Sequence, residues 1–235
     1  MTVEEAQATL VDANHVLARE GIVDAYGHVS VRHPSRPDRF FMSCSRSPAI
    51  VAPADIMEFM LDGTALDPRG RTPYLERFIH GAVYEARPEV NSVVHNHSYA
   101  LIPFGVVNTP IRPIFHIGAR IGREVPVWDI RDRFGDTNLL VTSMEIGRDL
   151  TTTLAGNVAL LMRGHGSVVT GESIQDSVLS ALYLQVNAQL QMQAMQLGEV
   201  SYLTPGEIDI GMAETRTRIG ADRAWQYLLS RLERR

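Results

Sequence analysis

The seven residues NSVVHNH (91–97) combine the pattern of a buried β-strand with two histidines at its end. Val93 and Val94 predict a short buried strand. His95 and His97 lie two residues apart, and because alternate side chains of a strand point to the same face, both imidazoles can converge on one point. Ligands of α/β folds gather at strand ends. The pair predicts either a metal site or a chance pairing of strand-end histidines, and alone it favours neither.

The chain on both sides of this strand alternates between predicted helices and strands. Apolar residues recur at helical spacing in several segments, and short apolar or alternating runs bounded by turn residues indicate strands. The predicted helices cover 3–20, 74–86, 143–155, 173–197 and 205–230, and the predicted strands cover 28–33, 39–43, 56–61, 91–96 and 158–162. Several strands are joined as hairpins, and no repeat or long linker divides the chain. We therefore predict a mixed sheet flanked by helices in a single α/β domain over residues 1–235.

The composition excludes several kinds of chemistry. The 235 residues carry a formal net charge of −5, which argues against nucleic acid and acidic membranes as partners. All 22 basic residues are arginines, which excludes a lysine Schiff base, lysine-held pyridoxal phosphate and a P-loop. Cys44 is the only cysteine, so neither an intrachain disulfide nor a thiolate zinc cluster can form. Without a signal-peptide pattern or a membrane-spanning run, we expect a cytoplasmic protein.

A third histidine can join the pair on the strand. His165 follows the apolar segment 158–162 and is flanked by two glycines, which allow a tight loop and a close backbone approach. If the two strands are neighbours, His165 can meet His95 and His97. Three neutral imidazoles form a cation-binding set that leaves coordination positions open for a substrate. The alternative is that His165 only caps a turn.

A carboxylate can complete such a site. Glu76 lies at the start of the predicted helix 74–86, and a short return into the strand 91–96 could place it over the end of that strand. There it would be an oxygen ligand or a base beside the metal. Without the histidines, a glutamate at this position is more often a solvated charge that compensates the helix dipole. His80, one helical turn further on, either orients the Glu76 carboxylate or packs in the core.

Three segments together resemble the class II aldolase and adducin head-domain family. They are GIVDAYGHVSVRHP (21–34), YLERFIHGAVYEARPEVNSVVHNHSYA (74–100) and LLMRGHGSVVTGES (160–173). The resemblance implies an α/β/α sandwich around a central, largely antiparallel sheet, assembled as a homotetramer with active sites between subunits. It also implies one divalent cation per subunit, held by three histidines and by a glutamate that becomes the acid/base group in turnover. These residues match His95, His97, His165 and Glu76.

The chain departs from the sugar-phosphate aldolases of that family at the positions that hold phosphate. Those enzymes use small hydroxyl and amide donors, where this chain has Gly27-His28, Ser45-Arg46 and Tyr74-Leu75. An arginine fork suits a planar carboxylate, so the change predicts a carboxylate substrate, although arginine also binds phosphate. The bulkier, more aromatic pocket resembles the decarboxylase branch of the family, which acts on hydroxylated aromatic or pyridine dicarboxylates.

Two further positions are assigned from the same resemblance. His116 matches a histidine in the loop that borders the site, but Ile117 follows it where some family aldolases have a proton-donating tyrosine. Tyr202 lies in the C-terminal region from which family members can close the site. We predict four substrate-binding residues, namely Arg46, Ser45, His116 and Tyr202.

The sequence thus predicts a metal-dependent carbon–carbon lyase that decarboxylates a dihydroxyphthalate-like or hydroxypyridine dicarboxylate. The predicted catalytic residues are Glu76, His28 and Tyr74, although His28 could simply bond within its turn and Tyr74 could simply pack. Zn²⁺ or Mn²⁺ is the expected cation, and Fe²⁺ or Co²⁺ also suits the ligands. The alternatives are a retro-aldolase for a small non-phosphorylated substrate and, from a different class, a non-catalytic adducin-like scaffold.

Overall fold

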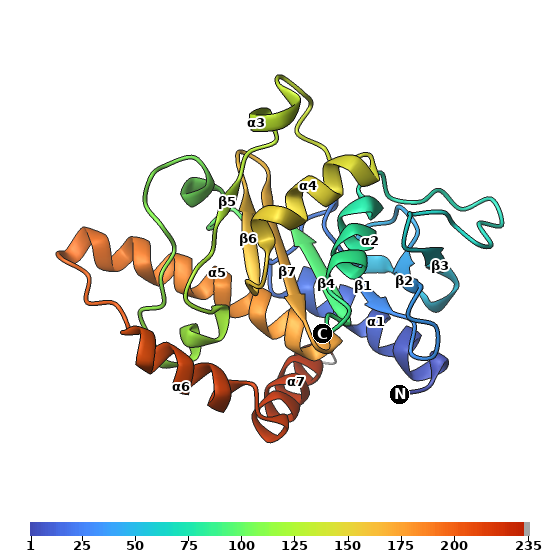
Figure 1. Cartoon of the computed structure of the whole chain (residues 1–235). Helices are drawn as coiled ribbons and strands as arrows, with labels where there is room; N and C mark the ends of the chain where they lie inside the picture. The colour runs from blue at the N-terminus through green and yellow to red at the C-terminus, as the bar shows by residue number, and fades with distance from the viewer. Residues whose placement is uncertain (233–235) are drawn as a thin grey trace.

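A seven-stranded sheet organises residues 1–232, the part of the chain that this computed structural model describes. The strand order is β3-β2-β1-β4-β7-β6-β5 (Figure 1). Neighbouring strands are antiparallel except β5 and β6, which are parallel. The strands are β1 (His28–Arg32), β2 (Arg39–Ser43), β3 (Ile56–Met60), β4 (Ser92–Asn96), β5 (Val127–Trp128), β6 (Ala159–Met162) and β7 (Gly166–Gly171). The predicted mixed, largely antiparallel sheet is confirmed.

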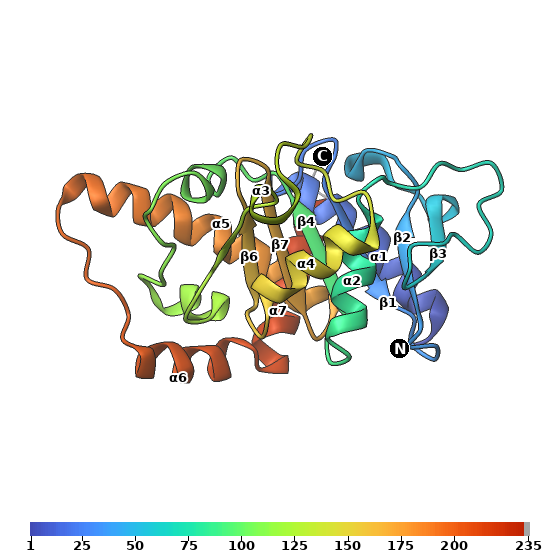
Figure 2. The same ribbon diagram turned by 45° about the horizontal axis from the view of Figure 1, so that its top comes forward.

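Helices cover both faces of this sheet (Figures 1 and 2). One face is covered by α2 (Arg77–Ala86) and α4 (Met144–Leu154). The other is covered by α1 (Val3–Arg19), α5 (Ile174–Leu197) and α7 (Arg218–Leu232). The remaining helices are α3 (Arg131–Phe134), α6 (Pro205–Thr215) and the 3₁₀ helices η1 (Pro48–Ile50), η2 (Pro53–Asp55), η3 (Ile102–Gly105) and η4 (His116–Ile121). The α/β/α sandwich is therefore also confirmed.

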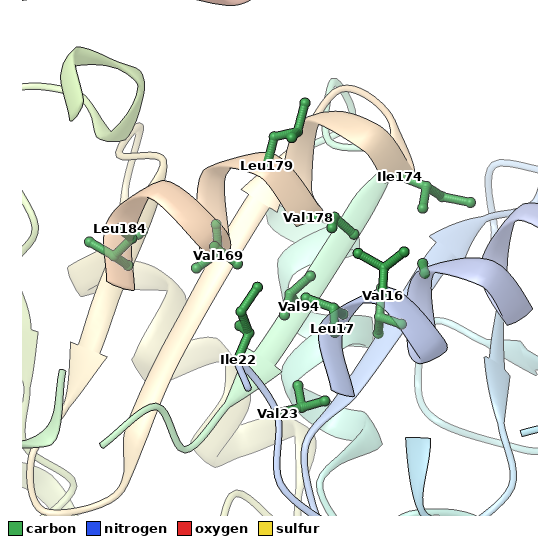
Figure 3. Close-up of a cluster of buried hydrophobic side chains, with 14 of the residues drawn as sticks. Val16, Leu17, Ile22, Val23, Val94, Val169, Ile174, Val178, Leu179 and Leu184 are labelled. Atoms are coloured by element: carbon green, nitrogen blue, oxygen red, sulfur yellow. The ribbon is translucent and has the colours of Figure 1, made fainter. Parts of the chain in front are cut away.

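Successive side chains of β4 point to opposite faces of the sheet, so they pack in two different apolar layers. Val94 packs in the layer under α1 and α5, where Figure 3 shows it with Leu17 and Val178. Val93 packs in the opposite layer, under α2 and α4. Because His95 shares the parity of Val93, the strand pattern assigns its imidazole to the face covered by α2. None of the described helices is long and apolar enough to cross a membrane.

Most predicted ends are within one residue of the structure, but several elements differ, and β5 and α3 were not predicted. The helix that was expected to start at 74 starts at Arg77, so Glu76 is its N-cap residue rather than part of the first turn. The glycine-rich segment after β6 contains a full strand, β7, although its small residues carry a weak strand signal. The single helix predicted over 205–230 is interrupted after Thr215 because the buried Arg120 donates to the Thr215 carbonyl, which a continuous helix would use internally.

We predict that Gly81→Ala destabilises the fold although it adds a good helix former to α2. The gain in helix propensity is about 1 kcal/mol, but the new Cβ would lie 1.9 Å from the backbone oxygen of Leu61. We expect the free energy of unfolding in urea to fall by about 2 kcal/mol. Gly206→Ala in α6 is the matched control, since its Cβ would meet no atom within 4 Å. Unchanged stability of Gly81→Ala would contradict this packing.

Candidate metal centre

The ends of two adjacent strands bring the three predicted histidines together. β4 pairs with β7 in a register that places His95 opposite Val168 and Asn96 opposite Ser167. His97 follows the end of β4, and His165 lies in the tight turn that joins β6 to β7. This antiparallel pairing places the turn beside the end of β4, as the sequence analysis expected for neighbouring strands.

Gly166 allows the turn to approach β4 closely. A Cβ at residue 166 would lie 2.1 Å from the backbone oxygen of Asn96 and 3.1 Å from a ring carbon of His97. Gly164 in the same turn has φ of +65°, a conformation that side chains rarely adopt. The glycines on either side of His165 are thus required by backbone geometry, and they set the position of its imidazole.

Glu76 reaches the same point from the other side of the site. As the N-cap residue of α2 it has φ −92° and ψ 18°, and its side chain makes no cap hydrogen bond to the helix. Its Oε1 atom instead accepts a hydrogen bond of 2.9 Å from the backbone N–H of Val141. The carboxylate is 7% exposed overall and faces the imidazoles rather than solvent, which rejects the alternative of a solvated, dipole-compensating charge.

The four side chains converge with the spacing of a coordination sphere. The Nε2 atoms of His95 and His97 are 3.1 Å apart, and those of His165 and His97 are 3.2 Å apart. Glu76 Oε2 lies 3.5 Å from His95 Nε2 and 3.4 Å from His165 Nε2. Bonds of about 2.0–2.1 Å to a tetrahedral cation require ligand atoms roughly 3.3 Å apart. These four distances are close to that requirement, and the ligand atoms of all four residues lie within 4.8 Å of one another.

Hydrogen bonds on the far side of each ring fix which nitrogen faces the centre. His95 Nδ1 lies 3.1 Å from the Ser167 carbonyl and His165 Nδ1 lies 3.0 Å from the Leu139 carbonyl. His97 Nδ1 lies 3.2 Å from both carboxylate oxygens of Asp24. These oxygens can only accept, so each Nδ1 carries the proton and each neutral imidazole directs the lone pair of Nε2 inward.

The charge of the cluster suits a divalent ion. Burial raises the pKa of the Glu76 carboxyl, but His165 and His95 lower it well below the ordinary value when their Nε2 atoms carry protons, and a cation bound to the same nitrogens acts in the same direction. Glu76 is therefore a carboxylate at neutral pH. One negative charge and three inward lone pairs fit a cation of charge +2, and imidazole with carboxylate suits Zn²⁺, Mn²⁺, Fe²⁺ or Co²⁺. The donor set alone does not select among them.

The predicted catalytic residues His28 and Tyr74 lie beside the cluster. β1 pairs with β4 so that His28 is directly opposite His95, and their ring centroids are 5.0 Å apart. The ring of Tyr74 packs against His28 at 4.6 Å, and its hydroxyl donates to the backbone carbonyl of Arg46. Burial raises the pKa of Tyr74. Tyr74 thus has the packing role that was its alternative, and its catalytic role stays a prediction.

The predicted substrate contacts Arg46 and Ser45 lie in the loop that Tyr74 anchors. The Arg46 guanidinium donates to the Ile50 carbonyl and pairs with Asp55 at 3.3 Å, so part of its charge is already balanced. Ser45 is exposed, and its backbone N–H donates to the Thr72 carbonyl. The sequence did not reveal the pairing with Asp55, because η2 brings that residue in from outside the motif. Both contacts with substrate stay predictions.

His116 and Tyr202 lie elsewhere on the subunit. The His116 side chain in η4 is 64% exposed and lies 3.8 Å from Glu214. Tyr202 follows α5, where the Arg112 guanidinium stacks over its ring at 4.1 Å and Gln191 donates to its hydroxyl. None of these contacts is with the four-residue cluster. The substrate-binding roles of His116 and Tyr202 stay predictions.

The bonding of His80 decides between the two roles that the sequence left open, and two supports of the cluster were not predicted. His80 does not orient Glu76, because both of its ring nitrogens bond instead to His28 and Ser30. Asp24 was quoted within a family segment but given no role. Backbone N–H groups of Tyr26 and Gly27 hold its carboxylate against His97. The turn pattern of Asp24 followed by Gly27 was the available signal.

The second overlooked support is the segment 139–141. The Leu139 carbonyl accepts from His165, and the Val141 N–H donates to Glu76. Leu139 has φ of +67°, which costs a non-glycine residue about 1 kcal/mol or more. The segment 139–141, which contains this strained residue, thus holds two of the four cluster members, and strained residues cluster at functional sites. Nothing in the local sequence predicts it, because the contacts link residues 26 and 65 positions apart.

Comparison with known proteins agrees with this geometry. Residues 8–192 match the model of the class II aldolase and adducin N-terminal domain, and the chain belongs to this family. It is 31% identical over 248 residues to the decarboxylase tropJ of Talaromyces stipitatus, covering 96% of this chain and 93% of that protein. It is 27% identical over 210 residues to the 3,4-dihydroxyphthalate decarboxylase of Rhodococcus jostii, covering 83% of each chain.

A solved structure shares the fold. The L-fuculose 1-phosphate aldolase from Glaciozyma antarctica superposes with a TM-score of 0.81 over 99% of this chain and 92% of that one, at 21% identity. The family and its relatives, which are decarboxylases and aldolases, support a lyase.

We predict that His97→Ala removes bound metal and leaves the fold intact. His97 Nε2 lies between those of His95 and His165, so its loss opens the centre of the ligand set. Elemental analysis of dialysed protein should give one divalent ion per wild-type chain and a small fraction of that in the variant. His15→Ala is the control, because His15 bonds only the Val51 carbonyl on the opposite face. Full metal content in His97→Ala would reject the site.

We predict that the apo fold loses stability as the pH falls below about 6.5. Burial, with a contribution from His95, lowers the pKa of His80 to about 3. Between the ordinary histidine pKa of about 6.5 and the lowered pKa of folded His80, this residue binds a proton in the unfolded chain but not in the folded one. The free energy of unfolding therefore decreases as the pH falls. Urea denaturation with a chelator at pH 7 and pH 5 should show a smaller decrease for His80→Phe than for wild type. Equal decreases in the two proteins would contradict this effect.

Proposed function

We propose that the protein is a divalent-metal-dependent carbon–carbon lyase that decarboxylates a hydroxylated aromatic or pyridine dicarboxylate. The observation that carries the proposal is the convergence of three Nε2 atoms and the Glu76 carboxylate at one point. The decarboxylase relatives support the reaction, and one of them is named for 3,4-dihydroxyphthalate. We further propose that His95, His97, His165 and Glu76 are the metal ligands.

Cleavage of a carbon–carbon bond leaves an electron pair on carbon, and the active site must stabilise that charge. A divalent cation bound to the neighbouring substrate oxygen supplies this stabilisation as the charge develops. His95, His97 and His165 hold their lone pairs inward through their Nδ1 hydrogen bonds, so no ring has to reorient during reaction. The chain supplies a prearranged site for charge rather than a nucleophile.

The neighbours of the cluster favour a planar, aromatic substrate. His28 and Tyr74 present two rings with centroids 4.6 Å apart beside His95, at positions where the aldolases have small polar donors. Bulky rings reduce the room for a tetrahedral phosphate and offer contact to another ring. Ser45 and Arg46 lie in the adjacent loop and would contact a substrate carboxylate. The Arg46 guanidinium also forms an ion pair with Asp55.

We also propose a homotetramer in which His116 and Tyr202 reach the site of a neighbouring subunit. Within one chain the contacts of these two side chains are with Glu214, Arg112 and Gln191 rather than with the cluster, which supports a role across a subunit interface. A cytoplasmic location remains an expectation from the sequence.

The second candidate function is a retro-aldolase for a small substrate without phosphate. It is favoured by the fold shared with the fuculose phosphate aldolase and by a 26% identical relative, the L-fuculose phosphate aldolase of Escherichia coli, over 67% of this chain. Ile117 lies where the proton-donating tyrosine would be expected, which weighs against that chemistry. A scaffold without catalysis is the least supported, because the chain retains a full ligand set.

We predict carbon dioxide release from 3,4-dihydroxyphthalate or a hydroxypyridine dicarboxylate by protein loaded with Zn²⁺ or Mn²⁺. Manometry together with ultraviolet spectra of the product would measure it, and His97→Ala with the same metal in the buffer is the matched control. Formation of an aldehyde or a keto acid from hydroxy-acid substrates, with no carbon dioxide, would replace the decarboxylase by the aldolase. Metal binding without any turnover of either substrate class would reject both.

A further inference from the structure

Four buried polar side chains form a continuous hydrogen-bonded row behind the candidate metal centre. His28 and Ser30 lie two residues apart on β1, and His80 and Tyr84 lie four residues apart on α2, so each pair shares one face of its element. His28 Nδ1 is 2.7 Å from His80 Nε2, His80 Nδ1 is 2.6 Å from Ser30 Oγ, and Ser30 Oγ is 2.7 Å from the Tyr84 hydroxyl.

The row lies in the core, where polar groups are costly unless each is satisfied. None of the four residues is more than 1% exposed. Phe40 stacks on the ring of His80 and lies tilted against that of Tyr84, and the Arg32 guanidinium lies 4.7 Å from the centre of the Tyr84 ring. Apolar side chains would fill this space more cheaply if packing were the only requirement.

The end of the row at Tyr84 sets the direction of its hydrogen bonds. Burial raises the pKa of Tyr84 well above its ordinary value, so the phenol keeps its proton at neutral pH. That proton goes to Ser30 Oγ, because the other group near the phenol oxygen, the backbone N–H of Val93, is itself a donor. Ser30, having accepted from Tyr84, donates its own proton to His80 Nδ1.

The direction of donation along the row fixes which nitrogen of His28 carries the proton. With Nδ1 of His80 accepting, the proton of this neutral ring is on Nε2, which donates to His28 Nδ1. Because Nδ1 of His28 accepts this hydrogen bond, it carries no proton, and the single proton of the ring is on Nε2, on the side away from His80. His28 differs in this from His95, His97 and His165, whose Nε2 atoms are free to bind a cation.

We propose that Tyr84, Ser30 and His80 are positioning residues that hold His28 in the Nε2–H form, so that it donates a hydrogen bond to an anionic substrate oxygen beside the metal centre. The inference rests on the proposed function for the identity of that oxygen, as a carboxylate or a ring hydroxylate. It assigns to His28 the role of a fixed donor and excludes it as a base in the resting enzyme, since its only unprotonated nitrogen is occupied by His80. The ring of His28 lies against those of His95 and Tyr74, which places the donor beside the candidate metal centre.

The test is the tautomer of His28 by ¹⁵N nuclear magnetic resonance of histidine-labelled full-length protein loaded with Zn²⁺. The His28→Asn spectrum assigns the His28 signals by their disappearance. We expect the wild-type ring to carry its proton on Nε2 and to have an unprotonated Nδ1 that accepts a hydrogen bond. A wild-type ring protonated on Nδ1 would overturn the proposal, and this measurement does not depend on any positioning variant folding well.

The row itself is tested with Ser30→Ala, which removes one hydroxyl and leaves His80 without a fixed donor. We expect the Nδ1–H form of His28 to appear in this variant. Ser177→Ala is the matched control, because Ser177 is an equally buried serine whose hydroxyl bonds Ser92 under α5. It should leave the His28 signals as in wild type. An unchanged His28 tautomer in folded Ser30→Ala would show that the row does not set it.

Turnover separates this inference from the proposed function. If carbon dioxide is released, Ser30→Ala should lower kcat/KM about tenfold, as expected for a weakened hydrogen bond to a charged group, with bound metal unchanged. Ser177→Ala should retain the wild-type value. Equal kcat/KM in Ser30→Ala and wild type would overturn the positioning role. Failure of the wild-type protein to release carbon dioxide would reject the proposed decarboxylase, while the tautomer measurement would still decide the state of His28.

Discussion

The site depends on one constraint, namely that three imidazoles turn the same nitrogen toward one point. Each ring is held by an acceptor that cannot give up a proton, and the acceptors come from three separate parts of the chain: Asp24, Leu139 and Ser167. The outcome is a set of lone pairs about 3 Å apart beside a carboxylate. Neutral rings in that arrangement repel one another unless a cation or a proton lies between them. A fold that maintains such repulsion is built for a ligand.

Much of this arrangement could be predicted from local sequence. The spacing of His95 and His97 on a strand fixes their common face, and the glycines around His165 indicate a tight turn. The family motifs supplied the link between those pieces and Glu76. The sheet and its two helical layers follow from strands and helices that alternate along the chain. The structure brings together the four residues that the sequence proposed as ligands.

The remainder could not be predicted because it depends on contacts between distant residues. Leu139 and Val141 act through backbone groups, which carry no sequence signal, and Asp55 takes part of the charge of Arg46 from another loop. His80 was placed by helical spacing on the Glu76 face, whereas packing of α2 on β1 turns it toward His28. His116 and Tyr202 are placed by contacts with Glu214 and Arg112, which no local pattern links to them.

Two sets of histidines with opposite tautomers thus lie side by side on the same face of the sheet. The first directs lone pairs to a cation, and the second, at His28, directs a proton outward. This contrast gives the pocket both an electron-pair acceptor and a hydrogen-bond donor, which is what a chelating oxyanion substrate requires. The need for a fixed donor at His28 also explains why β1 and α2 place four buried polar side chains in a region that apolar residues could fill.

The most direct test of the metal centre is anomalous diffraction from crystals of the full chain soaked in Zn²⁺ or Mn²⁺. The account predicts one strong anomalous peak per subunit, within about 2.0–2.2 Å of three Nε2 atoms and one oxygen of Glu76. A peak bound through Nδ1 atoms, a peak at another cluster, or no peak between residues 76, 95, 97 and 165 would contradict it.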